Sequence, residues 1–261
     1  MTTNAHFTNQ EYQTKNDWIH TDSSMPPVTP HLVRARLKAE GRNALLGHLG
    51  LAVGCIILYL ALTMALNAIV NCVLPTESGV IGTVLSLVFF LFISAFTGIY
   101  EYGLICIYLK LQFGQTAHSA DFFLGFRENQ DKIVILRLVP ALIEVICLLP
   151  ATVCSYLTEN KALFLLYLAL LILGIAATVF AKLLFYPSLY LLLDYPHQSA
   201  GEILQKSVRL MKGHKKELLF LELSFLPLWL LTLLSFGAAG LWVSAYQRST
   251  LAAYYRRRTE E

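Results

Sequence analysis

Long stretches without Asp, Glu, Lys or Arg constrain the fold of this chain more than any other feature. They include residues 43–76, 78–100 and 162–181. A bilayer core of about 30 Å is crossed by about 20 helical residues at roughly 1.5 Å per residue. Each stretch is long enough, and a helix satisfies its own backbone polar groups in lipid. Because 56% of the chain is hydrophobic and only 14% is charged, we predict an all-α, polytopic membrane protein.

Five apolar regions determine the number of predicted spans. The first four spans are predicted at Leu45–Asn71, Val80–Tyr100, Ile133–Tyr156 and Ala162–Ala181, the last with apolar character continuing to Leu193. The fifth region, Leu218–Tyr255, is compatible with one long helix or with two shorter spans that turn at Ser235–Gly240. The glycines in that turn favour two spans.

The basic residues decide between five spans and six. Eighteen of the twenty Lys and Arg residues fall into four clusters between the apolar regions. The clusters comprise Lys15, Arg34, Arg36, Lys38 and Arg42; Lys110, Arg127, Lys132 and Arg137; Lys206, Arg209, Lys212, Lys215 and Lys216; and Arg248, Arg256, Arg257 and Arg258. Six spans place all four clusters on one side, as the positive-inside rule requires, with both termini cytoplasmic. The sixth span is expected to be short or tilted, with Arg248 snorkelling to the interface.

This topology divides the chain into three parts. Residues 1–30 are polar, lack the apolar core of a signal peptide and end in a proline-rich segment, so we predict a disordered cytoplasmic tail. Residues 31–256 form the predicted six-span membrane domain, and residues 257–261 form a cytoplasmic C-terminal end. The net charge of +3 comes largely from clusters beside the membrane, which indicates anionic lipid rather than nucleic acid as a partner.

A basic amphipathic helix is predicted after span four. Ser199 and Glu202 form a capping box that marks its start, and Gly213 is placed to end it in a left-handed conformation. The predicted apolar face consists of Leu204, Val208 and Met211. The basic residues that face elsewhere, Lys206, Arg209 and Lys212, are the candidate lipid contacts. Such a helix is expected to lie flat on the inner leaflet.

A similar pattern follows span two, where the segment Ser119–Arg127 offers Phe122, Phe123 and Phe126 as an apolar face. A third basic segment, residues 32–42, leads into span one. The repetition is compatible with an ancient duplication and equally with the general need of a polytopic protein for interfacial connectors.

Several motifs resemble a bacterial membrane-protein family, domain of unknown function 975. They are Asp194-Tyr195-Pro196, Ser207, Met211-Lys212-Gly213-His214-Lys215, Leu223-Ser224-Phe225, Leu241-Trp242, Tyr254-Tyr255, Phe123-Leu124-Gly125-Phe126 and Arg34-Ala35-Arg36. The resemblance covers roughly residues 31–256. The chain departs from the family pattern in two ways. Ala245-Tyr246 stands where the family usually has Pro-Tyr, which affects the expected geometry of the last span, and the thirty-residue N-terminal tail is not part of the pattern. The family has no established activity, so the resemblance implies a fold and a bacterial plasma-membrane location only.

Five charged residues within or beside the spans form a candidate intramembrane polar site. Glu144 is expected about 18 Å from the inner end of span three, where an ionised carboxylate is costly. It is either a proton or cation site or, as we favour, a neutral acid hydrogen-bonded to a neighbouring helix. The other four are expected at one level near the inner interface, as a cavity floor or, preferably, a structural ion-pair network. They are Glu101, Arg137, Lys182 and Glu222.

No sequence motif indicates an enzyme, a metal site or a cofactor. Cys72 and Cys154 are both expected near the outer face, where they would pair only if their Cα atoms lay within about 7 Å. The sequence therefore predicts a non-enzymatic scaffold or accessory protein of the cell membrane, with anionic lipid and a protein partner or a second copy as its contacts. A small-molecule or ion transporter is the alternative, and a lipid-acting enzyme lacks any supporting constellation.

Overall fold

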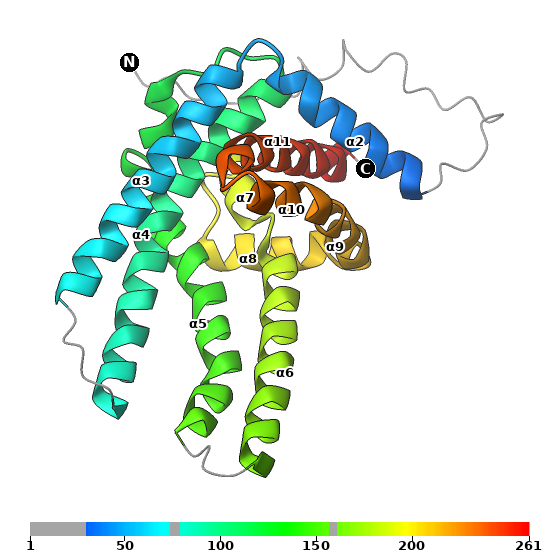
Figure 1. Cartoon of the computed structure of the whole chain (residues 1–261). Coiled ribbons are helices and arrows are strands. Elements are labelled where there is room, and N and C mark those ends of the chain that lie inside the picture. The colour runs from blue at the N-terminus through cyan, green and yellow to red at the C-terminus, as the bar shows by residue number, and fades with distance from the viewer. Residues whose placement is uncertain (1–29, 74–78, 157–160, 261) are drawn as a thin grey trace.

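The computed structural model describes residues 30–73, 79–156 and 161–260, and these residues are all-helical, as predicted (Figure 1). The elements are α2 (Pro30–Leu45), α3 (Leu49–Val73), α4 (Val80–Gln112), the 3-10 helix η1 (Ser119–Phe126), α5 (Gln130–Ser155), α6 (Lys161–Phe185), α7 (Ser188–Asp194), α8 (Ala200–Leu210), α9 (Lys215–Leu223), α10 (Leu226–Leu234) and α11 (Ala238–Glu260). The predicted 1–30 tail lies outside the described residues except for Pro30.

Five helical segments are long and apolar enough to cross a membrane. They are Leu49–Cys72, Ile81–Gln112, Gln130–Ser155, Ala162–Asp194 and Lys215–Leu234. Only 11–17% of the residues in their most apolar windows are buried inside the protein. In water such exposed apolar surface would be unfavourable, whereas lipid accommodates it. The first four correspond to the first four predicted spans, and the prediction of six spans is not confirmed.

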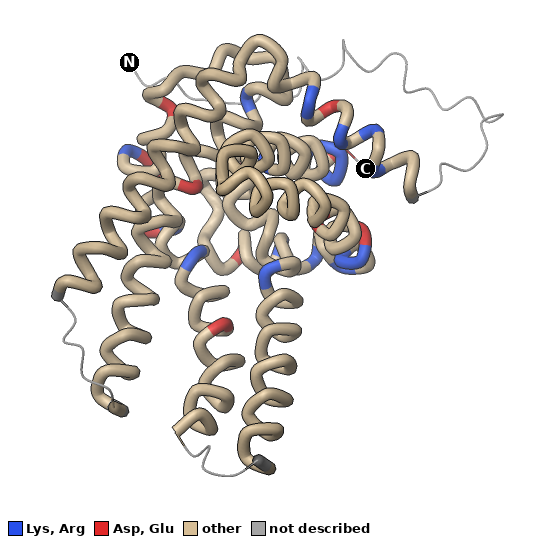
Figure 2. Tube along the Cα trace, in the orientation of Figure 1, with Lys and Arg blue, Asp and Glu red and all other residues tan. Residues whose placement is uncertain are grey.

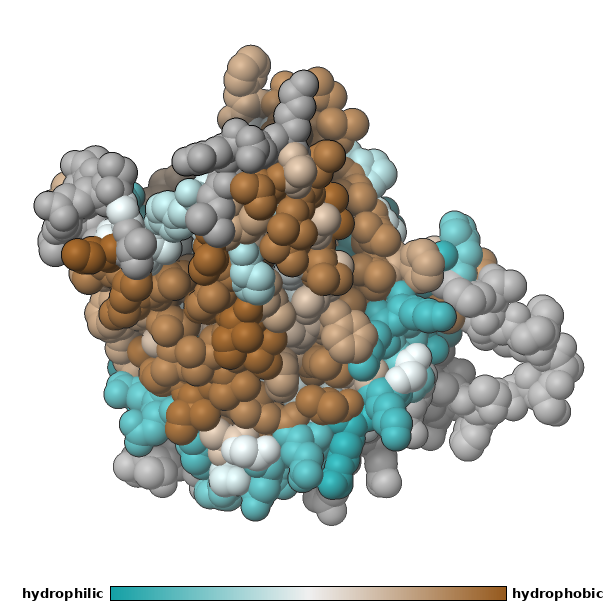
Figure 3. All heavy atoms as spheres, turned by 90° about the horizontal axis from the view of Figure 1, so that it is seen from below, coloured by the Kyte–Doolittle hydropathy of each residue, from teal (hydrophilic) through white to brown (hydrophobic). Residues whose placement is uncertain are grey.

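The charges gather at one end of the molecule. Figure 2 shows most Lys, Arg, Asp and Glu positions in the upper half of the view, around α2, α9 and α11, while the lower halves of α3, α4, α5 and α6 carry almost none. Figure 3, seen from below, shows hydrophobic residues over most of that face and hydrophilic residues along its lower and right edges.

The predicted turn at Ser235–Gly240 is present, but the helix that follows it is a core element rather than a fifth or sixth apolar span. Phe236 and Gly237 have φ of 51° and 92°, and α11 starts directly after them. Within α11 the buried residues run from Val243 to Tyr255, and the helix packs against α2, α3 and α4. Their side chains are mostly small: Val243, Ala245, Ser249, Thr250, Ala252, Ala253, Tyr254 and Tyr255.

Small residues allow α2, α4 and α11 to approach closely. A Cβ on Gly41 would lie 2.8 Å from the Thr250 Cα. The Ser249 hydroxyl donates to the Gly41 carbonyl at 2.8 Å, and the Gln112 amide donates to the Ser249 carbonyl at 2.9 Å. All four groups are buried or nearly so, so these hydrogen bonds satisfy polar atoms at a close helix crossing.

The segment after α4 differs from its prediction. It forms the 3-10 helix η1, which packs on α4 with Phe122 fully buried and stacked on Tyr100 at 5.8 Å between ring centroids. A Cβ on Gly103 would collide with the Phe122 carbonyl group, and one on Gly125 would collide with the Ile99 carbonyl. The predicted apolar face is therefore divided: Phe122 faces α4, whereas Phe123 is 44% exposed.

The helix predicted after span four is α8, and its ends are as expected. The Glu202 amide donates to the Ser199 hydroxyl at 3.3 Å, and the Ser199 amide donates to the Glu202 carboxylate at 3.1 Å. Gly213 has φ of 89°. The predicted apolar face was displaced, because the buried positions are Ala200, Ile203, Ser207 and Met211 while Val208 is 38% exposed. Ser207 belongs to this face because its hydroxyl donates to the Leu184 carbonyl at 2.8 Å.

Candidate intramembrane polar site

Four helices bring charged and aromatic side chains together where the apolar part of α4 ends. The Glu101 carboxylate on α4 forms ion pairs with two guanidinium groups, that of Arg137 on α5 at 3.1 Å and that of Arg248 on α11 at 4.0 Å. The Arg248 guanidinium lies 5.2 Å from the ring centre of Tyr59 on α3. We call these four residues the Glu101 cluster.

The position of Arg137 depends on a glycine one turn before Glu101. A Cβ on Gly98 would lie 2.8 Å from the Arg137 Cγ, so the arginine stem crosses α4 at a residue that leaves room for it. Two guanidinium groups and one carboxylate leave the cluster with one positive charge in excess. Glu101 Oε2 and Arg137 Nε are buried and have no hydrogen-bond partner among the described residues. The cluster therefore depends on charge pairing rather than on a complete hydrogen-bond network.

A second ion pair lies deeper in the spans. The Lys182 ammonium on α6 lies 3.1 Å from the Glu144 carboxylate on α5. The two side chains differ in environment, because Lys182 is 62% exposed and Glu144 is 23% exposed. The lysine stem thus reaches along the helix surface to an acid that would otherwise face the apolar layer alone.

The structure regroups the five residues of the predicted polar site. It brings Glu101 and Arg137 together and assigns Lys182 to Glu144, which the sequence placed at a different level. Glu222 on α9 is partly buried and forms no ion pair among the described residues. The four charges of the predicted layer therefore do not form one group: Glu101 pairs with Arg137, Lys182 pairs with Glu144 from outside the layer, and Glu222 remains.

Sequence reasoning missed two members of the Glu101 cluster. Tyr59 lies within an apolar stretch and carried no signal of its own. Arg248 was expected to extend to the interface, but its side chain is 27% exposed and points at Glu101. A lone arginine late in an apolar region was the available signal, because such a residue almost always faces the bundle interior and a partner.

The three candidate lipid contacts, two on α8 and Lys212 just after it, are not equivalent. The Lys206 ammonium lies 3.1 Å from the centre of the Tyr195 ring, so its charge is held against the protein. Arg209 and Lys212 are exposed.

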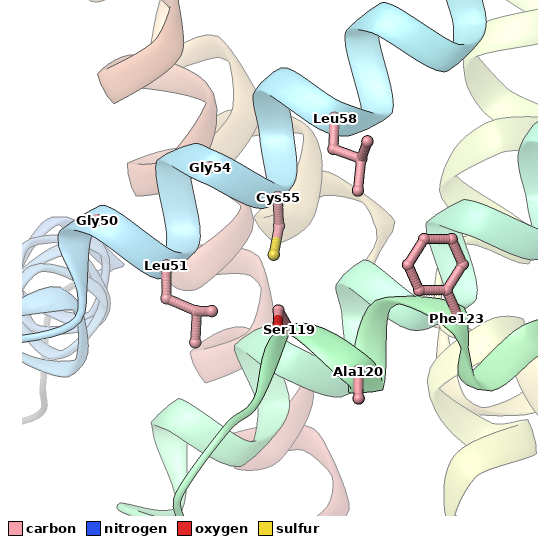
Figure 4. Close-up of a pocket in the computed structure, with 8 residues that line it drawn as sticks. All are labelled: Gly50, Leu51, Gly54, Cys55, Leu58, Ser119, Ala120 and Phe123. Carbon is pink, nitrogen blue, oxygen red and sulfur yellow. The ribbon is translucent and has the colours of Figure 1, made fainter.

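An apolar groove of about 370 Å³ lies between α3 and η1 (Figure 4). Its lining residues are Gly50, Leu51, Gly54, Cys55, Leu58, Ser119, Ala120 and Phe123. Of these only Cys55 is titratable, and the described residues contain no cluster of His, Cys, Asp or Glu that would hold a metal ion. Apart from the single Cys55 thiol, the groove offers apolar contact and no acid–base or metal-ligating side chain.

The cysteines expected near the outer face do not form a disulfide in the structure. Cys72 is exposed and Cys154 is buried, and both are free thiols. The Cys154 thiol lies 3.7 Å from the Leu163 carbonyl, to which it donates. Its partner is therefore the start of α6 rather than the end of α3.

Replacing Lys182 with Gln is expected to lower the free energy of unfolding by no more than about 1 kcal/mol. The lysine is 62% exposed, so its ion pair with Glu144 contributes as little as other exposed pairs do. Chemical denaturation in detergent micelles measures the change. A loss of several kcal/mol would show that the pair is more deeply buried than its exposure indicates.

Comparison with known proteins agrees with the resemblance of the motifs. The model of a family described as "Protein of unknown function (DUF975)" matches residues 33–261. No curated protein and no solved structure matches the chain significantly. Because the matched region covers all of the described helices except the first turn of α2, the chain belongs to the protein family of unknown function DUF975.

Proposed function

We propose that this protein is a non-enzymatic scaffold or accessory protein of the bacterial cell membrane that holds its polar end against anionic lipid. The single observation that carries the proposal is the convergence of three basic segments, on α2, on α8–α9 and at the end of α11, at the end of the molecule opposite the charge-free helix ends (Figure 2). With this end on the cytoplasmic side, both termini are cytoplasmic and the positive-inside rule is obeyed.

Contacts between the three segments support a common basic surface. The Lys38 ammonium on α2 donates to the Ser224 carbonyl after α9 at 2.9 Å. Arg256 on α11 lies 3.5 Å from Glu40 on α2, and Arg257 lies 3.8 Å from Glu217 on α9. These contacts fix the segments to each other, so their charges act as one surface.

The surface carries more positive charge than its own acids neutralise. Glu217 alone is approached by His214, Arg257 and Arg258. Further basic side chains on this surface are exposed: Arg36, Arg42, Arg209, Lys212 and Lys216. A fixed excess of exposed cations beside a membrane favours anionic headgroups, at about 1 kcal/mol per residue near the surface.

The double substitution Arg209→Gln with Lys212→Gln is expected to weaken binding of phosphatidylglycerol by about 2 kcal/mol, or roughly 30-fold at low salt. Both side chains are exposed, Arg209 in the last turn of α8 and Lys212 two residues after its end, on the side of the segment that is not buried. Native mass spectrometry of the detergent-solubilised protein, titrated with phosphatidylglycerol and with phosphatidylcholine, measures the difference.

Lys206→Gln is the matched control, because Lys206 is on the same helix but is held over the Tyr195 ring. It is expected to change lipid binding less than the double substitution does. Equal binding by the parent and the double variant would reduce these residues to orientation signals and would contradict the proposal.

Transport is the second candidate function, and it rests on the charged residues within the spans. The observation that favours it is the Glu101 cluster, in which Glu101 Oε2 and Arg137 Nε are buried without hydrogen-bond partners among the described residues. Ion pairing of Glu101 and of Glu144 favours a structural role for both acids. Flux into liposomes of a panel of ions and small cations, with Glu144→Gln as the comparison, tests the alternative. Flux that requires Glu144 would replace the scaffold proposal.

A further inference from the structure

We infer that α10 and the first part of α11 form a hairpin that enters only the inner leaflet, so that its tip contacts the lipid acyl chains of that leaflet. The protein then crosses the membrane with α3, α4, α5 and α6–α7 alone. The inference rests on the membrane location proposed above but not on lipid-headgroup binding.

Glu101 and Arg248 are paired and so lie at the same level, from which the length of α4 toward the outer side can be compared with the length of the hairpin. From Glu101 to the outer end of α4 at Val80 there are 21 residues, or about 32 Å of helix, which matches a bilayer core. From Arg248, which is paired with Glu101, to the start of α11 at Ala238 there are only 10 residues, or about 15 Å. Starting at the same level, the hairpin reaches about half as far.

The other arm of the hairpin, formed by α10, is also short. The Trp229 indole N–H donates to the Gln247 amide oxygen at 3.0 Å, which places Trp229 beside the residue that precedes Arg248. From Trp229 only five residues, about 8 Å, remain to the end of α10 at Leu234.

The preceding helix, α9, does not extend the apolar arm, because it lies beside the polar half of α11. The Tyr254 hydroxyl donates to the His214 carbonyl at 3.4 Å, and Glu217 pairs with Arg257. The segment Lys215–Leu234 is thus long enough to cross a membrane by composition, but it is divided between a polar level and an apolar one at Ser224–Phe225.

The hairpin also runs in a different direction from the four spans. In Figure 1, α11 and α10 lie across the view while α5 and α6 run down it, so the hairpin is not parallel to them. A tilted hairpin penetrates less than its own length, so about 15 Å is an upper limit to its depth.

Side-chain exposure indicates an apolar surrounding for the tip. No residue of α10 is buried within the protein. Leu233, Leu234 and Phe236 are 75%, 73% and 102% exposed. Trp229 and Trp242 are 39% and 42% exposed, and they lie between the tip and Arg248, the arrangement of an aromatic belt near the headgroups. Charged residues at one end, aromatic residues next and aliphatic residues at the tip fit a single leaflet.

Site-directed spin labelling of the full chain tests the depth. The five cysteines are replaced by alanine, and one nitroxide is attached at Phe236→Cys, at Tyr156→Cys beyond the outer end of α5, or at Lys212→Cys after α8. In nanodiscs, collision with oxygen reports the acyl region and collision with a water-soluble nickel chelate reports the aqueous phase. The label at position 236 is expected to show a several-fold higher oxygen-to-nickel ratio than both references.

Two results would overturn the inference. A label at position 236 with a ratio as low as those at Tyr156 and Lys212 would show that the tip lies outside the acyl region, on one side of the bilayer or the other. Quenching by brominated lipids provides a second measurement with the native cysteines retained. A Phe236→Trp chain whose other tryptophans are replaced by Phe must be quenched better by bromine within the acyl chains than by bromine near the headgroups. Preferential quenching by bromine near the headgroups contradicts the inference.

The hairpin and the lipid-binding proposal fail independently. If substituting Arg209 and Lys212 did not change lipid binding, the lipid-binding proposal would fail, but the expected depth of the hairpin tip would not change. If the hairpin crossed the membrane completely, the inference about its depth would fail, but the basic surface would remain.

Discussion

Glu101→Gln is expected to destabilise the protein by about 3–5 kcal/mol, the largest effect that any single polar substitution in the Glu101 cluster should have. The substitution keeps the size of the side chain but removes the carboxylate that pairs with both Arg137 and Arg248. Two guanidinium groups would then share a partly buried site without a counter-charge. The free energy of unfolding, measured by chemical denaturation in detergent micelles, reports the loss.

A double-mutant cycle separates the charge pairing from other effects. Removing Arg248 as well, as Arg248→Gln, leaves one cation instead of two and is expected to recover part of the loss, with a coupling energy of about 0.5–3 kcal/mol. Glu128→Gln, at an exposed position after η1, serves as the control and is expected to change stability by less than about 0.5 kcal/mol. If Glu101→Gln behaves like this control, the cluster does not hold α4, α5 and α11 together.

The first four spans could be predicted from the sequence because lipid imposes a length and a composition on each helix independently of its neighbours. Predicted and observed ends of these spans agree within a few residues at the outer side, as at Val80 and at Ser155. The inner end of span two was predicted too early, because α4 continues to Gln112 within the protein core, where hydropathy no longer distinguishes a lipid-facing helix from a protein-covered one.

The role of α11 could not be predicted for the same reason. Its small residues, such as Ala245 and Ala252, have an apolar character that suits lipid and a tight protein interior equally. What determines its place is the fit of Ser249 and Thr250 against Gly41, a contact across 208 residues of sequence between Ser249 and Gly41. No periodicity within α11 reports the surface that it meets.

Charge pairs in the candidate site depend on two quantities that a single sequence does not contain, the rotation of each helix and its level relative to the next. Glu101 and Arg137 were correctly expected near one level because both lie at the inner end of a span, Glu101 just after span two and Arg137 near the start of span three. Lys182 was expected there too, but its long stem reaches Glu144 instead. The capping residues Ser199 and Glu202 were predictable because their interaction is local, within a single helical turn.

Gly103→Ala is expected to lower the free energy of unfolding by about 2–3 kcal/mol, because the added methyl group would overlap the backbone of η1. The obstacle is the Phe122 carbonyl group, and a backbone carbonyl cannot move aside as the end of a flexible side chain does. To accept the methyl group, η1 has to shift away from α4, which would loosen the stacking of Phe122 on Tyr100. Denaturation in micelles measures the loss, and faster proteolysis between Gly114 and Asn129 would locate it.

Gly54→Ala is the matched control for this substitution. Gly54 also lies within a long apolar helix, but a Cβ there meets no atom within 4 Å. Its replacement is expected to leave stability within about 1 kcal/mol of the parent, with any change in the favourable direction because alanine is the better helix former. The difference between the two variants therefore isolates the contact of η1 with α4 from the general effect of adding a methyl group to a membrane helix. Equal stabilities of the Gly103 and Gly54 variants would show that η1 does not rest on α4.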